Sequence, residues 1–90
     1  MRVPRQPNAN LEAAHRHSSS HREEVLASDL CGCFYCRKTF VPSEIRKWIP
    51  ERDGGETALC PRCGIDSVIG SRAGFAITKE FLREMNRDWF

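Results

Sequence analysis

The chain has 90 residues, of which 40% are hydrophobic and 29% charged, with five cysteines and a formal net charge of +2. This length gives one small domain, which commonly needs a metal ion or disulfides to supplement its core. No apolar run approaches the roughly 20 residues that span a membrane, and none near the start indicates a signal peptide. An odd number of cysteines fits disulfides poorly, so we expect a reducing, cytoplasmic location without a membrane partner.

Residues 1–19 are predicted to form a flexible polar tail, and residues 20–90 a single zinc-binding domain. The tail contains two prolines and polar residues with little to bury, and Leu11 to Ala14 could form only a transient helical turn. His15, His17 and His21 make a loose cluster near its end. We interpret them as solvated side chains; the alternative is an accessory metal site.

Ordered structure is expected to begin at Ser20. Ser20-His-Arg-Glu23 fits a capping box, in which a hydroxyl at the N-cap and a glutamate three residues later satisfy free backbone N–H groups. The predicted helix is short and ends near Asp29, so it must dock on the rest of the domain through Val25 and Leu26.

Two Cys-x2-Cys pairs dominate the chain: Cys33 with Cys36, and Cys60 with Cys63. Each pair places two thiolates on one tight turn, and two such turns fill the four corners of a Zn²⁺ tetrahedron. We predict one closed structural zinc site, with no open position for water or substrate.

Cys31 is the fifth cysteine. It could replace Cys33 as a ligand, although the two-residue spacing favours Cys33 with Cys36. We interpret Cys31 as a small buried hydrophobic residue; the alternative is a reactive thiol whose pKa is lowered by a neighbouring cation or helix end.

The segment between the pairs is predicted to be a hairpin that runs into Cys60. Residues 39–41 have strand character before Pro42, residues 44–49 alternate, and residues 50–55 are rich in turn formers. A helical turn over residues 45–49 is the alternative. The arginines and lysines of this region are interpreted as balancing the thiolate charge.

The element after Cys63 decides the fold class. A helix there gives a treble clef, whereas a strand over residues 65–69 gives a zinc ribbon, and periodicity does not separate them. Asp66 or Ser67 is expected to cap a turn after the second pair. A last helix is predicted to begin after Thr78 as N-cap, with Ile77 and Leu82 at hydrophobic staple positions, and to bury a stripe through Met85 and Trp89.

The motifs HREEVLASDLCGCFYC, TALCPRCGIDSVIG and FLREMNRDWF resemble a family of short, uncharacterised bacterial cytoplasmic proteins, over residues 21–90. The resemblance implies zinc ligands at Cys33, Cys36, Cys60 and Cys63 and brings no established activity. More loosely, the segment LCPRCGI is similar to the second knuckle of GATA-type treble-clef fingers. We therefore expect a small α+β treble-clef-like domain, with the zinc ribbon as alternative and short helices at both ends.

Three functions were weighed from these residues. A zinc-stabilised binding or adaptor module that recognises another protein is favoured over an enzyme, because a closed metal site offers no reacting position. The Cys-Pro-Arg-Cys motif alone would suit a redox dithiol, but the chain is short for the fold that carries it. A metal-dependent nuclease would need histidines between or after the cysteine pairs, and all three precede them.

Charge bears on nucleic acid as a partner. Residues 1–22 hold four arginines and one glutamate, a net charge of +3, whereas residues 23–90 hold ten lysines and arginines against eleven acidic residues, a net charge of −1. A Zn²⁺ with four thiolates adds about −2 to this core. A nucleic-acid-binding zinc finger is thus the disfavoured alternative.

Overall fold

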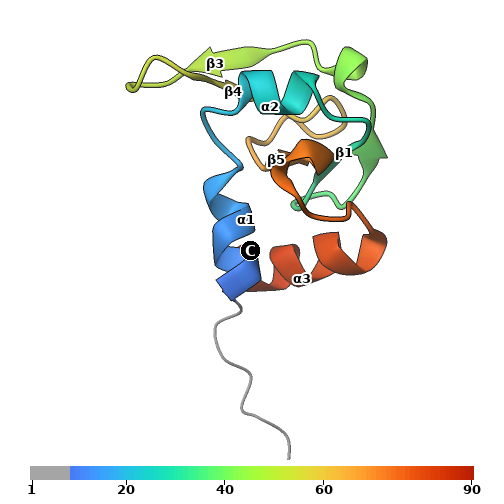
Figure 1. The fold of residues 1–90 in the computed structure, drawn as a ribbon. Helices are drawn as coiled ribbons and strands as arrows, with labels where there is room; N and C mark the ends of the chain where they lie inside the picture. Colours follow the sequence, from blue (N-terminus) through green and yellow to red (C-terminus); the bar gives the residue numbers. More distant parts are fainter. Residues whose placement is uncertain (1–8) are drawn as a thin grey trace, which may run out of the picture.

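The computed structural model describes residues 9–90 and combines three helices with two small antiparallel sheets (Figure 1). Helices α1 and α3 lie together at one end of the molecule, and α2 lies with the β3–β4 hairpin at the other. The chain is therefore a small α+β domain. No helix of the described part is long and apolar enough to cross a membrane.

The central sheet has the strand order β2-β1-β5. Strand β1 (Cys31–Cys33) pairs with β2 (Thr39–Phe40) on one side and with β5 (Val68–Gly70) on the other. Because side chains alternate across a strand, Val68 faces one hydrophobic cluster and Ile69 faces a second. The sheet thus separates a core beside the cysteine pairs from a core beneath α1 and α3.

Close packing on the second face requires a glycine in β1. A Cβ atom at Gly32 would lie 2.8 Å from side-chain carbons of both Ile77 and Leu82, which is closer than van der Waals contact allows. The absence of a side chain lets the start of α3 lie directly on the sheet.

The predicted hairpin before the second cysteine pair is confirmed. Strand β3 (Trp48–Pro50) pairs with β4 (Glu56–Ala58), and the backbone N–H of Leu59 extends the ladder to the carbonyl of Lys47. A 3₁₀ turn, η1 (Pro42–Glu44), connects β2 to this hairpin. The alternative of a helical turn over residues 45–49 is wrong, since Trp48 and Ile49 belong to β3.

Helix α3 (Lys79–Trp89) begins as predicted. The hydroxyl of Thr78 accepts a hydrogen bond from the backbone N–H of Phe81 at 3.0 Å. Leu82 and Met85 are fully buried on the helix face that meets the sheet. A second 3₁₀ turn, η2 (Ser71–Ala73), follows β5.

Helix α2 (Arg22–Leu26) starts later than predicted. Its N-cap is His21, without a side-chain capping bond, so the capping box at Ser20 is wrong. Ser20 has a positive φ of 50°, and its hydroxyl donates to the carboxylate of Asp53 at 2.9 Å. The hydroxyl that the local pattern assigned to the N-terminus of the helix is bonded instead to a residue distant in sequence.

Residues 9–19 do not form the predicted polar tail. They contain α1 (Ala9–Arg16), on which Leu11 is 2% exposed and Ala14 is fully buried, in one cluster with Leu82 and Met85 of α3. Three-residue spacing puts Leu11 and Ala14 on the same side of a helix. So short a helix is marginal alone but is stabilised by this packing. Residues 1–8, the rest of the predicted tail, lie outside the described residues.

Candidate metal centre

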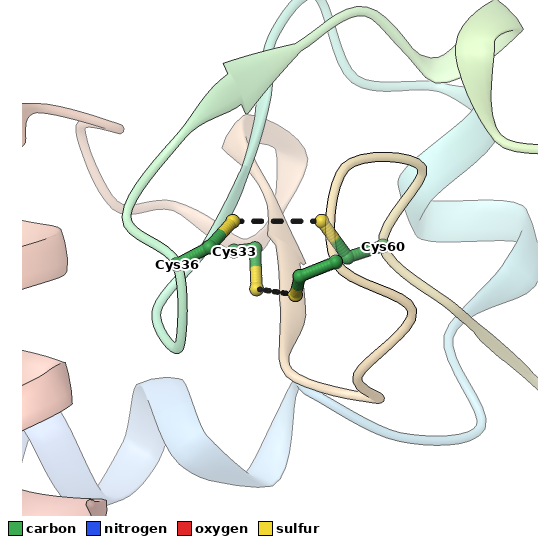
Figure 2. Close-up of side chains that lie close together, drawn as sticks. Cys33, Cys36 and Cys60 are labelled. Atoms are coloured by element: carbon green, nitrogen blue, oxygen red, sulfur yellow. Dashed lines mark hydrogen bonds between the residues drawn. The ribbon is translucent and has the colours of Figure 1, made fainter.

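The two cysteine pairs lie on two turns that the central sheet brings together. Cys33 ends β1 and Cys36 lies in the turn towards β2, while Cys60 follows β4 and Cys63 lies in the turn before β5. Since Cys33 is the pairing partner of Val68 in the β1–β5 register, the end of the second turn lies beside the start of the first. The sheet register therefore positions all four predicted ligands around one point. Figure 2 shows Cys33, Cys36 and Cys60 of this group.

The four sulfur atoms have the spacing of a tetrahedral thiolate site. All lie within 4.8 Å of one another, with Cys33 and Cys63 3.7 Å apart and Cys36 and Cys60 3.8 Å apart. Zinc–sulfur bonds of about 2.3 Å in a tetrahedron require sulfur–sulfur edges of about 3.8 Å. The donor set and its spacing thus fit a tetrahedral metal ion, and the two short contacts join one turn to the other.

The two turns repeat the same backbone hydrogen bond. The N–H of Arg37 donates to the carbonyl of Cys33 at 2.7 Å, and the N–H of Gly64 donates to that of Cys60 at 2.9 Å. The donor in each turn has a left-handed backbone, with φ of 64° at Arg37 and 83° at Gly64. Glycine adopts this conformation freely, whereas arginine adopts it at a cost of about 1 kcal/mol. Backbone hydrogen bonds alone therefore close a turn around each cysteine pair.

Hydrogen bonds to the sulfur atoms of Cys60 and Cys33 stabilise negative charge there. The backbone N–H of Arg62 donates to the sulfur of Cys60 at 3.3 Å. The hydroxyl of Ser67, itself 2% exposed, lies 3.1 Å from the sulfur of Cys33. Such bonds orient a thiolate and spread its charge.

The pKa values of the cysteines differ accordingly. Burial alone raises the pKa of Cys33, but hydrogen bonds from Ser67 and from the backbone of Cys36 and Tyr35 outweigh it, leaving the pKa below that of an ordinary thiol. Burial raises the pKa of Cys60, and it raises the pKa of Cys63 to about 12. Metal binding must therefore displace protons from the second pair.

Cys31 stands apart from the four-sulfur cluster. Its side chain is fully buried, and its thiol donates weakly to the carbonyl of Val25 at 3.9 Å. Burial raises the pKa of Cys31 to about 11. It behaves as the predicted small hydrophobic residue, and neither a reactive thiol nor a replacement for Cys33 is supported.

Ser67 contacts a candidate ligand, a role that its sequence position did not indicate. Its predicted role was to cap a turn, whereas its hydroxyl reaches Cys33 and its carbonyl accepts the N–H of Phe34 at 3.0 Å. Asp66, the other candidate, is exposed. The sequence feature that indicates a buried hydroxyl at this position is its place directly before the apolar run Val68-Ile69, where the chain enters the core.

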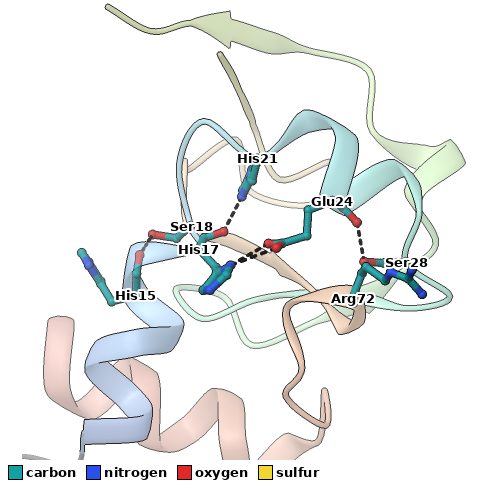
Figure 3. A network of polar contacts seen from close by, with 7 residues as sticks. All are labelled: His15, His17, Ser18, His21, Glu24, Ser28 and Arg72. Atoms are coloured by element: carbon teal, nitrogen blue, oxygen red, sulfur yellow. Dashed lines mark hydrogen bonds and ion pairs between the residues drawn. The ribbon is translucent and has the colours of Figure 1, made fainter. Parts of the chain in front are cut away.

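The histidines do not form a solvated cluster. His21 is 4% exposed: its Nε2 accepts the backbone N–H of Ala58 at 3.1 Å, and its Nδ1 donates to the carbonyl of His17 at 2.6 Å (Figure 3). These roles require a neutral ring. The side chain of His17 lies 2.9 Å from Glu24, and the ring of His15 stacks on Trp89 at 4.4 Å. Among the described residues, the four cysteines form the one group that could hold a metal.

The sequence matches no family model, and no curated protein or solved structure is significantly similar to it. The functional argument therefore rests on the site itself.

Proposed function

We propose that this chain is a small binding module whose fold is held by one structural Zn²⁺, with Cys33, Cys36, Cys60 and Cys63 as its ligands. The observation that carries the proposal is the tetrahedral spacing of the four sulfur atoms, which lie within 4.8 Å of one another. Tetrahedral four-sulfur sites hold zinc or iron in proteins. Zinc is favoured because it stabilises small domains of this type without redox chemistry.

We assign the fold to the zinc-ribbon type rather than the treble clef. The element after the second cysteine pair is β5, which pairs with β1, and no helix begins there. The helix that the expected treble clef requires after Cys63 is therefore replaced by the strand of the zinc-ribbon alternative. Membership of the family of short bacterial proteins that the sequence resembles remains part of the proposal, and it adds no activity.

A binding role is favoured over catalysis by the way the polar groups are used. Four thiolates complete the coordination of zinc and leave no position for water or substrate. His21 has both ring nitrogens engaged in structural hydrogen bonds. The partner is proposed to be another protein, and a reducing compartment such as the cytoplasm would keep the five free thiols available.

Metal analysis of the purified protein tests this function. We expect close to one zinc per chain and slow reaction of the thiols until a chelator removes the metal. Cobalt substitution should give the absorption spectrum of tetrahedral thiolate coordination. Iron at the site would overturn the choice of metal, while metal-free protein with a reactive Cys60–Cys63 dithiol would favour the redox alternative. That alternative is opposed by the position of Cys60 and Cys63 in one four-sulfur cluster with Cys33 and Cys36.

A further inference from the structure

A groove lies beside the second cysteine pair, between the start of the β3–β4 hairpin and the turn that holds Cys60. Its volume is about 320 Å³. Leu59 and Pro61 line it with apolar surface, and Arg46, Lys47 and Arg62 supply its charge. No carboxylate is among its lining residues. An apolar surface bordered by cations suits a ligand that carries both a carboxylate and an apolar group.

A carboxylate of the chain itself already forms an ion pair with one of these cations. Glu44 Oε1 lies 2.8 Å from the guanidinium of Arg62. Both side chains are substantially exposed, so the pair contributes little to stability and a competing carboxylate can replace it. Arg46 and Lys47 are exposed and take part in no ion pair among residues 9–90. The groove therefore offers two cations without an ion pair in the described part of the chain, beside a third that already binds a carboxylate.

The hairpin separates charge along its length. Arg46 and Lys47 lie at the end that joins the cysteine turn. At the other end, Glu51 and Asp53 outnumber Arg52 in the turn, and Glu56 of the last strand pair is bound to Arg22. The paired strands of three residues extend the hairpin by about 10 Å. A short acidic segment in the groove stays clear of the acidic end, whereas a longer polyanion along the hairpin would meet it.

We propose that this groove binds a short acidic and amphipathic segment of a partner protein. Its carboxylates lie between Arg46, Lys47 and Arg62, and an apolar side chain of the segment covers Leu59 and Pro61. The inference rests on the proposed zinc-stabilised binding module and names its partner surface. A protein segment is favoured over single-stranded nucleic acid because no aromatic side chain lines the groove for base stacking.

The test uses the full zinc-loaded chain and a fluorescently labelled peptide of alternating glutamate and leucine, followed by anisotropy. We expect saturable binding that weakens about tenfold in Lys47→Glu, equivalent to about 1.4 kcal/mol. Arg52→Glu makes the same kind of charge reversal in the turn of the hairpin and serves as the matched control. It should leave the affinity within about twofold, and zinc content and circular dichroism should be unchanged in both variants.

Several results would contradict the proposal that this groove binds an acidic segment. They are the absence of binding, equal losses in Lys47→Glu and Arg52→Glu, equal binding of a lysine–leucine peptide, or tighter Lys47-dependent binding of oligothymidylate. Zinc content on the same sample separates the two proposals. Stoichiometric zinc without peptide binding contradicts only the proposed binding at the groove. A metal-free protein contradicts the proposed zinc-stabilised module itself.

Discussion

The hydroxyl of Ser67 lies 3.1 Å from the sulfur of Cys33, and both side chains are buried. A hydroxyl in this position can donate to a thiolate, which has no proton of its own. The contact links the residue before β5 to the end of β1, so one hydrogen bond both orients a ligand and ties together the two turns of the site. Partners of this kind orient metal ligands and tune their affinity for the metal.

Replacing Ser67 with alanine should weaken zinc binding by about 10- to 100-fold, because the thiolate of Cys33 loses its donor. Competition with a chromophoric chelator measures the affinity. The same loss leaves the thiolate more nucleophilic, so an alkylating reagent should release zinc faster. Ser43→Ala removes an exposed hydroxyl from η1 and is the control. Equal zinc affinities in the two variants would show that the contact is incidental.

Replacing Cys36 or Cys60 with serine should unfold the domain, because a structural zinc site contributes its binding energy to folding. Cys31→Ala is the matched comparison: this cysteine is buried, as Cys60 is, but lies outside the four-sulfur cluster. It should retain one zinc per chain and lose about 1 to 3 kcal/mol of stability. Zinc content and circular dichroism distinguish the two classes. A Cys60→Ser protein that kept both metal and fold would mean that the ligands are wrongly assigned.

The features predicted correctly are those written in short stretches of sequence. The cysteine pairs carry their own geometry in two-residue spacing, and Thr78 caps α3 through an N–H only three residues away. The hairpin before Cys60 is likewise marked by turn residues between two strands. Within each turn, cap and hairpin the interacting atoms are close in the chain, so local chemistry decides the structure. The meeting of the two cysteine turns depends instead on the pairing of β1 with β5.

The features predicted wrongly or left open depend on partners distant in sequence. Ser20 had a suitable helix beside it, yet its hydroxyl bonds to Asp53, 33 residues away. The apolar run Val68-Ile69 became a strand because β1 offered it an open edge. Helix α1 exists because α3 provides a surface for Leu11. None of these partners is visible from the local pattern.

Truncating Leu11 to alanine tests whether α1 belongs to the domain. The side chain is 2% exposed and packs in the cluster of Leu82 and Met85, so we expect a loss of about 2 to 5 kcal/mol and a lower melting temperature of the zinc-loaded protein. Glu12→Ala, on the exposed side of the same helix, should change little. Deleting residues 1–19 should be at least as harmful as Leu11→Ala. A deletion without effect on stability would instead support the interpretation of residues 1–19 as a polar tail.

His21 should make stability depend on pH. Burial lowers its pKa below 6.5 more than the backbone of His17 and the charges of Glu24 and Glu51 raise it. Below pH 6.5 the unfolded chain therefore binds a proton at this position more readily than the folded chain. The contribution of neutral His21 is present above that pH and is lost as the pH falls through the lowered pKa.

The comparison of the parent protein with His21→Gln isolates this effect, because both proteins carry the same cysteines and the same His15 and His17. At neutral pH the variant should be less stable by about 1 to 3 kcal/mol, since the N–H of Ala58 and the carbonyl of His17 lose their buried partner. Denaturant unfolding with excess zinc should then show this difference shrinking as the pH falls below 6.5, because only the parent protein must keep an imidazole neutral. A difference that stays constant over this range would mean that His21 binds a proton as readily in the folded chain as in the unfolded chain. That result would contradict its assignment as a buried acceptor for the N–H of Ala58.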